Sequence, residues 1–174
     1  MASNKKYLLD SDVLIGAKNI YYRPNFCAAF WDWVEAGHAS EKIFSIDKVK
    51  AELLNAKETD VLYSWAQRPT LSNFFLPSMA AAPKWADLSN WAVDAANSFS
   101  MTAQSKFLNA ESADAWLIAY AAHAKGYTVV TNEVSAPFSK RNIKLPDAAK
   151  VLSVETISLF DLLHMHARNT FDFK

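Results

Sequence analysis

The stretch KYLLDSDVLIG, residues 6–16, joins a short apolar run to two carboxylates and decides the fold class. Residues 7–10 show no alternation of polar and apolar side chains, which is the pattern of a strand covered on both faces of a parallel sheet. Asp10 and Asp12 come at the end of this run. Because open α/β sheets build their sites at the carboxyl ends of the strands, we expect a candidate site here.

Strands and helices are predicted to alternate along the rest of the chain. Further strands are expected at residues 43–46, 73–76, 127–131 and 151–154, and helices at residues 24–37, 48–57, 60–67, 83–99, 111–125 and 157–167. Residues 100–109 are expected to form a connector, and a long loop should hold Pro137 and Pro146. This alternation implies right-handed crossovers. The predicted fold is therefore an α/β, three-layer α/β/α sandwich with a mainly parallel central sheet, formed by residues 1–174 as one domain.

The composition indicates a compact, helix-rich globule, because 51% of the 174 residues are apolar, 13% are aromatic and three are glycine. There is no charged and apolar leader and no apolar run of about 20 residues, so we expect neither export nor a membrane span. The single cysteine, Cys27, excludes an internal disulfide and a zinc site built on several thiolates. A cytoplasmic protein is expected.

The formal net charge is zero, with 18 acidic and 18 basic residues, which argues against general duplex binding. If a metal neutralised several of the acids, a locally basic rim would remain. Scattered lysines and arginines are ordinarily only solvated surface, and this alternative to a basic rim stays open for each of them. The candidates for the rim are Lys18, Arg23, Lys48, Lys50, Lys140, Arg141 and Lys144.

Three more acids lie in settings comparable to that of Asp10. Glu52 is in a predicted helix beside an apolar stripe, where a solvated glutamate is the ordinary case. Asp114 shares a helix face with Leu117 and Ile118, and a carboxylate in such a stripe must be paired or metal-bound. Glu133 follows a predicted strand.

The acids need a partner if the fold brings them together. Carboxylates a few ångströms apart raise one another's pKa values, so several of them stay charged only with a cation nearby. Thr131 and Asn132 precede Glu133 and offer hydrogen bonds to a ligand carboxylate. Alternatively, Asp10 caps the next helix, and Asp12 is a cap or a supporting residue. The sequence predicts a divalent-metal site on a parallel sheet.

The order of these motifs resembles that of PIN domains, a family of metal-dependent nucleases that includes ribonuclease toxins of toxin–antitoxin pairs. The resemblance rests on LLDSDVLI, an AEL helix, SADAWLIAYAA and VVTNE, and it spans residues 7–154. It implies that Asp10, Glu52, Asp114 and Glu133 are catalytic and ligate Mg²⁺ or Mn²⁺. Asp12, Thr131 and Asn132 would support them.

The resemblance also implies single-stranded RNA as the substrate and an antitoxin protein as a partner. Glu133 stands where the family usually has aspartate, and residues 60–99 are longer than in the smallest toxins. The aromatic residues at 26–34 and 85–99 offer a homodimer face or an antitoxin groove. For the tryptophans of 85–99, core packing is the ordinary interpretation and base stacking the alternative.

Two other functions remain open. One is a PIN-like binding module whose nuclease activity is weak or lost. The other is a phosphatase of the haloacid-dehalogenase type, because Asp-Ser-Asp after an apolar strand is also that family's nucleophile signature. That family also needs a later lysine and two adjacent acids, and Glu133 is followed by Val134.

Overall fold

The computed structural model describes residues 5–168 and contains one five-stranded, all-parallel sheet. No helix within these residues is long and apolar enough to cross a membrane. The strands lie in the order β3-β2-β1-β4-β5. They are β1 (Lys6–Leu9), β2 (Ile43–Ile46), β3 (Phe75–Leu76), β4 (Tyr127–Val130) and β5 (Thr156–Ile157).

The central strands are apolar because both of their faces are covered. All four residues of β2 are buried, and so are the last three of β1 and of β4. The chain fills the sheet from β1 through β2 to β3 and then crosses back to place β4 on the other side of β1. The strand order therefore reverses between β1 and β4, and such a switch point opens a crevice at the carboxyl ends of the two strands.

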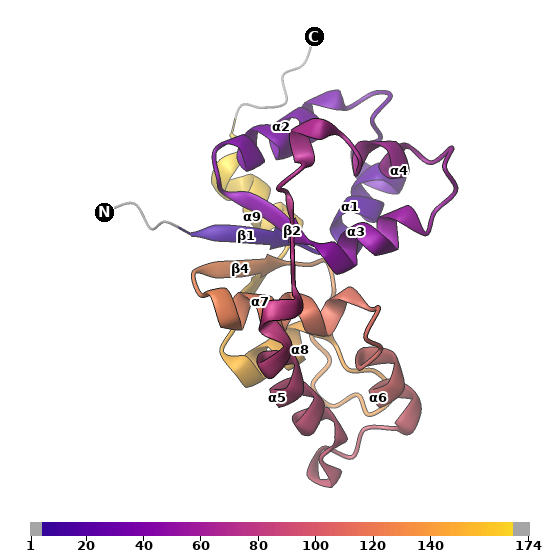
Figure 1. The fold of residues 1–174 in the computed structure, drawn as a ribbon, viewed down its shortest axis with the longest axis vertical. Coiled ribbons are helices and arrows are strands. Elements are labelled where there is room, and N and C mark those ends of the chain that lie inside the picture. Colours follow the sequence, from indigo (N-terminus) through magenta and orange to yellow (C-terminus); the bar gives the residue numbers. More distant parts are fainter. Residues whose placement is uncertain (1–4, 169–174) are drawn as a thin grey trace.

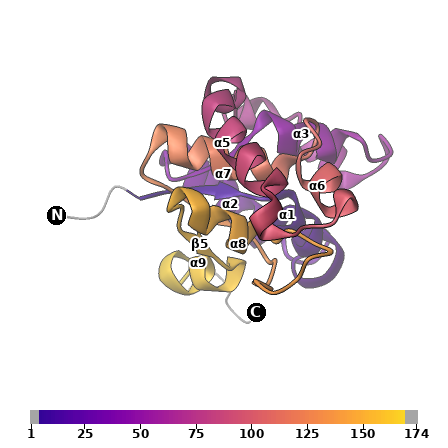
Figure 2. The same cartoon turned by 90° about the horizontal axis from the view of Figure 1, so that it is seen from below.

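Helices cover both faces of the sheet, as expected for the three-layer sandwich. In Figure 1, α2 lies at the top of the molecule and α5 at the bottom; Figure 2 shows α5 and α7 above the strands and α9 below them, on the opposite face of the sheet. The α-helices are α1 (Ser11–Gly16), α2 (Ala28–Ala39), α3 (Asp47–Leu54), α4 (Val61–Trp65), α5 (Ala82–Val93), α6 (Met101–Phe107), α7 (Ala113–Ala124), α8 (Leu145–Ala149) and α9 (Leu159–His166). Shorter turns are the π-helical η1 (Ala17–Tyr21) and the 3₁₀ helices η2 (Pro69–Leu71), η3 (Met79–Ala81), η4 (Ala95–Asn97) and η5 (Lys150–Leu152).

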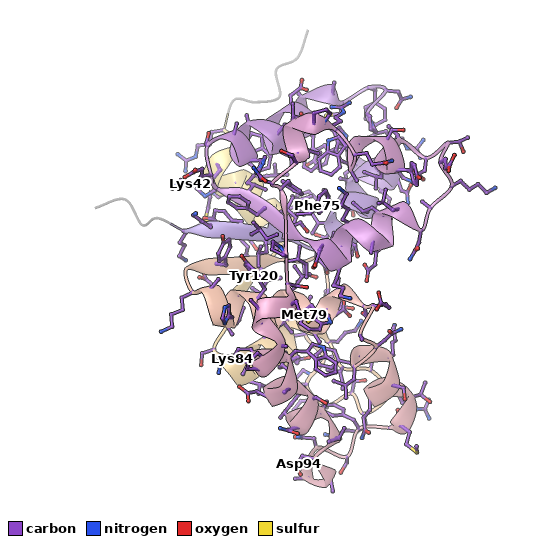
Figure 3. All side chains as sticks on the ribbon, in the orientation of Figure 1. Lys42, Phe75, Met79, Lys84, Asp94 and Tyr120 are labelled. Carbon is purple, nitrogen blue, oxygen red and sulfur yellow. The ribbon has the colours of Figure 1, made fainter. Side chains whose placement is uncertain are left out.

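Helix α7 is the central helix of its layer. It contacts β4 and β2 on one side and α5 and α8 on the other. Seven of its residues are buried, and they point in every direction around its axis. Helix α5 packs on α7 and ends at Val93, and the next residue, Asp94, lies far from α2 (Figure 3).

The structure confirms the fold class and corrects several of the predicted elements. The strand expected at residues 151–154 is wrong: η5 occupies its start, and Ser153, with a φ of 55°, interrupts the extended backbone before β5. The expected connector at residues 100–109 contains α6, which Ser100 caps by accepting a hydrogen bond from the Ala103 N–H at 3.2 Å. The first long helix begins at Ala28 and runs past Gly37.

Candidate metal centre

The switch point brings Asp10 beside Thr131. Leu9 and Val130 are paired in the register of β1 and β4, and the Asp10 backbone N–H donates to the Val130 carbonyl at 3.0 Å. Both strands end at this pair, so the residues that follow leave the sheet at the same edge. Asp10 and Thr131, two of the predicted site residues, therefore lie together at the carboxyl ends of β1 and β4.

Asp10 is a buried carboxylate with two hydrogen-bond donors. Its side chain is 2% exposed. Oδ1 accepts from the Ser11 N–H at 2.7 Å, which makes Asp10 the N-cap of α1, and Oδ2 accepts from the Thr131 hydroxyl at 3.0 Å. The prediction that Asp10 caps a helix is confirmed. Its role as a metal ligand stays a prediction.

Asp12, in the first turn of α1, faces the residues that follow β4. Its Oδ2 accepts from the Asn132 backbone N–H at 3.0 Å and lies 3.4 Å from the Thr131 hydroxyl. Thr131 Oγ1 in turn accepts from the Glu133 N–H at 3.2 Å. Thr131 therefore links this edge by hydrogen bonds, and Asn132 contributes its backbone N–H to Asp12. That these residues support a metal site stays a prediction.

The start of α7 lies at the same edge of the sheet, because a helix that leads into a parallel strand runs antiparallel to that strand. Asp114 is in its first turn. Glu52, from α3, accepts a hydrogen bond from the Ala113 N–H through Oε1 at 2.8 Å. The N-cap residue Ser112 makes no side-chain capping bond, so Glu52 satisfies this donor from another helix.

Glu133 is engaged by its own chain. Its Oε1 lies 3.2 Å from the Lys144 ammonium, and Oε2 accepts from the Leu145 N–H at 2.8 Å. These contacts join Glu133, the third residue after β4, to the start of α8. The glutamate therefore closes the loop between β4 and α8.

The acids are close enough to disfavour one another's ionised forms. Burial, followed by the charges of Asp12 and Asp114, raises the pKa of Asp10 well above its usual value. Burial, followed by the charges of Glu133 and Glu52, raises the pKa of Asp114 to about 6, and nearby Lys106 opposes this rise. The ionised forms of Asp10 and Asp114 are therefore both disfavoured at this edge.

The pKa of Asp12 is also raised, chiefly by burial and further by the charge of Glu133, while the hydrogen bond from the Asn132 N–H acts in the opposite direction. Two of the predicted supporting residues therefore lower the cost of negative charge at this edge. Asn132 does so for Asp12, and the Thr131 hydroxyl does so for Asp10.

The donor chemistry suits a hard divalent cation. Carboxylate oxygens are the preferred ligands of Mg²⁺ and Mn²⁺, and a cation would relieve the mutual repulsion of these acids. Among residues 5–168, however, no group of three or more His, Cys, Asp and Glu side chains is arranged so that it could hold a metal ion. The predicted ligands share one edge, and their side chains must move to ligate a common ion.

Two residues that lie beside the acids were not predicted from the sequence to belong to the site. Lys106, from α6, and Asn142, from the loop before α8, line a small pocket against Asp114 and Glu133. The signal for Lys106 was the capping serine at position 100 with apolar Ala103 and Phe107 at helical spacing. For Asn142 the sequence carries no comparable signal.

Residues 7–171 match the model of a family described as a domain of unknown function (DUF4411). No curated protein and no solved structure matches the chain. The family's description names no activity, so it neither supports nor opposes the resemblance to PIN domains.

Proposed function

We propose that this chain, which belongs to the DUF4411 family, is a metal-dependent ribonuclease that cleaves single-stranded RNA. The observation that carries the proposal is the buried Asp10 carboxylate at the switch point of the sheet, whose pKa is raised by burial and then by the charges of Asp12 and Asp114. An open α/β sheet places its chemistry at this point. A perturbed carboxylate in such a crevice is a candidate functional group.

The residues that would hold the ion are Asp10 and Asp114, with Glu52 and Glu133 at either side. Each carboxylate has two oxygens and about four lone pairs, so the hydrogen bonds that these acids already accept leave sites for a cation. A bound Mg²⁺ or Mn²⁺ supplies Lewis acidity, orients the phosphate and lowers the pKa of a bound water.

The surrounding residues position the acids and balance charge. Thr131 holds the Asp10 carboxylate by its hydroxyl, and the Ser11 N–H holds its other oxygen. Lys106 and Lys144 line the pocket against Asp114 and Glu133, where they can pair with the oxygens of a phosphodiester. The pocket holds only about 20 Å³, so a phosphate would meet these residues at its mouth, and an unpaired, flexible strand can bring a phosphate there more readily than a duplex.

The decisive experiment measures cleavage of a labelled single-stranded RNA with Mg²⁺ or Mn²⁺ for the wild type and for Asp10→Asn and Asp114→Asn. Both substitutions keep the side-chain shape and remove a charge. We expect both variants to lose metal-dependent cleavage while remaining folded, with melting temperatures no lower than that of the wild type. Cleavage at the wild-type rate in both variants would remove these residues from the site.

The proposal includes a cytoplasmic toxin role with an antitoxin partner. Of the aromatic residues at 26–34, Phe26 is 67% exposed while Phe30 and Trp31 are buried, so only part of this segment remains available for a partner or a homodimer. Expression of the wild type should arrest growth, and expression of Asp10→Asn should not. Growth arrest by both would separate any toxicity from the acids.

A binding module is the second candidate, and the engagement of Glu133 by Lys144 and the Leu145 N–H favours it. A metal that binds only the folded state raises its melting temperature by mass action. An unchanged melting temperature at millimolar Mn²⁺ would therefore favour the binding module over the nuclease.

The phosphatase alternative is disfavoured by the contacts of Asp10. Both of its oxygens accept hydrogen bonds and its side chain is 2% exposed, so it is poorly placed to attack a phosphate. Trapping a phosphoryl group on Asp10 would restore this alternative, because a metal-dependent hydrolase that uses water forms no such intermediate.

A further inference from the structure

Two neighbouring pockets lie along the loop before α8. The small pocket at Asp114 and Glu133 shares Asn142, Ile143 and Lys144 with a second pocket of about 180 Å³. That second pocket extends toward the end of α5. Because the two pockets share these residues, they are neighbours, and a strand with one phosphodiester at the acids would need to pass only the shared residues to reach the second pocket.

Aromatic side chains form one wall of the second pocket. Trp91, from α5, and Phe99, before α6, both line it, and their ring centroids are 5.2 Å apart in an edge-to-face arrangement. Both rings are half-buried, so each keeps a part of its surface open to the pocket. Drug-sized ligands occupy roughly 300–1,000 Å³, so this smaller volume suits a single planar base.

A lysine lies over the aromatic wall. The Lys140 ammonium is 5.3 Å from the centroid of Phe99 and donates to the Asn97 carbonyl at 2.8 Å. Within residues 5–168, Lys140 has no carboxylate partner, whereas Lys144 is paired with Glu133 and Lys150 with Asp147. Lys140 is therefore a fixed positive charge beside an aromatic surface.

We propose that this groove, formed by Trp91, Phe99 and Lys140, binds one base and one phosphate of the single strand whose neighbouring phosphodiester lies at the acids. The inference rests on the proposed function, because the groove is assigned to the strand that the acids would cut. Nonspecific single-strand sites combine aromatic stacking platforms with a positively charged track. A duplex cannot present an unpaired base to the aromatic wall.

Binding of a fluorescein-labelled oligouridylate of about 10 nucleotides, a usual site size for single strands, tests the groove. Fluorescence anisotropy is measured in the presence of a chelator, so that cleavage is not required. The variants are Lys140→Glu, Trp91→Ala and the conservative Trp91→Phe. The matched control is Lys125→Glu, which makes the same charge change just before β4, at the amino end of the strand and away from the acids at its carboxyl end. Melting temperatures check that each variant is folded.

We expect Lys140→Glu to weaken binding and to reduce the slope of log affinity against log salt by about 0.7, the value for one phosphate contact on a single strand. Trp91→Ala should weaken binding roughly five- to a hundredfold through lost stacking, and Trp91→Phe should restore most of it. Lys125→Glu should bind as the wild type does, and a duplex of the same length should bind more weakly than the single strand.

Wild-type affinity in both Lys140→Glu and Trp91→Ala would overturn the inference, and so would an equal loss in Lys125→Glu. The two proposals fail separately. Groove-dependent binding without metal-dependent cleavage removes the nuclease and keeps the groove. Cleavage that needs Asp10 but is unaffected by Lys140→Glu and Trp91→Ala keeps the nuclease and removes the groove.

Discussion

Replacing Asp114 by asparagine should make the metal-free protein more stable while removing its response to metal. In the folded chain, burial and then the charges of Glu133 and Glu52 raise the pKa of Asp114 from 3.8 to about 6. A carboxyl group with a raised pKa binds its proton more tightly in the folded state than in the unfolded chain. At pH 7.5 the group is ionised in both states, and its charge destabilises the folded state.

The size of this effect follows from the shift. One pKa unit corresponds to about 1.4 kcal/mol, so a rise of about two units corresponds to about 3 kcal/mol as an upper limit. The partly open pocket screens some of this, and removing a negative charge from the first turn of α7 costs up to about 1 kcal/mol. We therefore expect Asp114→Asn to gain about 2 kcal/mol at pH 7.5, or roughly 4–8 °C in melting temperature for a chain of this length.

The assay is thermal and urea unfolding with a chelator and again with a series of Mn²⁺ concentrations. The melting temperature of the wild type should rise as Mn²⁺ increases, because its free energy of unfolding gains about 2.7 kcal/mol at a Mn²⁺ concentration of a hundred times the dissociation constant. The melting temperature of Asp114→Asn should not change with Mn²⁺. Asp87→Asn is the matched control, because Asp87 is an exposed residue of α5 paired with Lys84 at 3.0 Å. It should melt like the wild type in both conditions.

Two results would refute the reasoning. A metal-free Asp114→Asn protein that is less stable than the wild type would show that the carboxylate supports the fold. A variant that keeps the full Mn²⁺ response would show that the ion, if it binds, does so without Asp114.

The remaining predictions concern pH, the cap of α7 and the packing of α2. The stability difference between Asp114→Asn and the wild type should be small near pH 4 and should grow as pH rises through about 6, since the stabilising proton on Asp114 is lost there; a difference in urea midpoints that does not change with pH would contradict the assigned pKa. Glu52→Ala should cost about 1 kcal/mol through loss of the bond to the Ala113 N–H, while Glu52→Gln keeps an acceptor and should retain this stability in the same urea assay. Gly37→Ala should destabilise the chain by about 1–3 kcal/mol, because its Cβ would lie 2.5 Å from Ile43 Cδ1; an unchanged melting temperature would place α2 differently on β2.

The sequence predicted the parts of the site that depend on local pattern. The apolar run before Asp10 identified a buried strand, and its end placed the carboxylate correctly. Thr131 was found for the same reason, since it follows the apolar β4.

Asp114 was found by a weaker argument. It shares a helix face with Leu117 and Ile118, which are buried as expected, but α7 is buried on nearly all sides. Any polar residue in the first turn of such a helix would have looked equally significant. What distinguishes Asp114 is the position of the helix start at the carboxyl edge of the sheet, which follows from topology.

Contacts between segments far apart in the chain could not be predicted from the local sequence pattern. Glu52 and Ala113 are 61 residues apart, and nothing in either local pattern indicates the capping bond between them. The error at residues 151–154 has a different cause. Four apolar-rich residues suit a strand, but Ser153 adopts a left-handed backbone that ends any extended run.

The closure of the β4–α8 loop by Glu133 has a mechanical consequence. Glu133 contacts both Lys144 and the Leu145 N–H, and these contacts hold together the two ends of a loop that includes Phe138, which is 93% exposed. An ion that draws the carboxylate toward Asp114 must break both contacts. We therefore expect limited proteolysis to cut the backbone of residues 134–143 faster when the ion is bound. The cleavage rate of this loop would then measure whether the ion occupies the site.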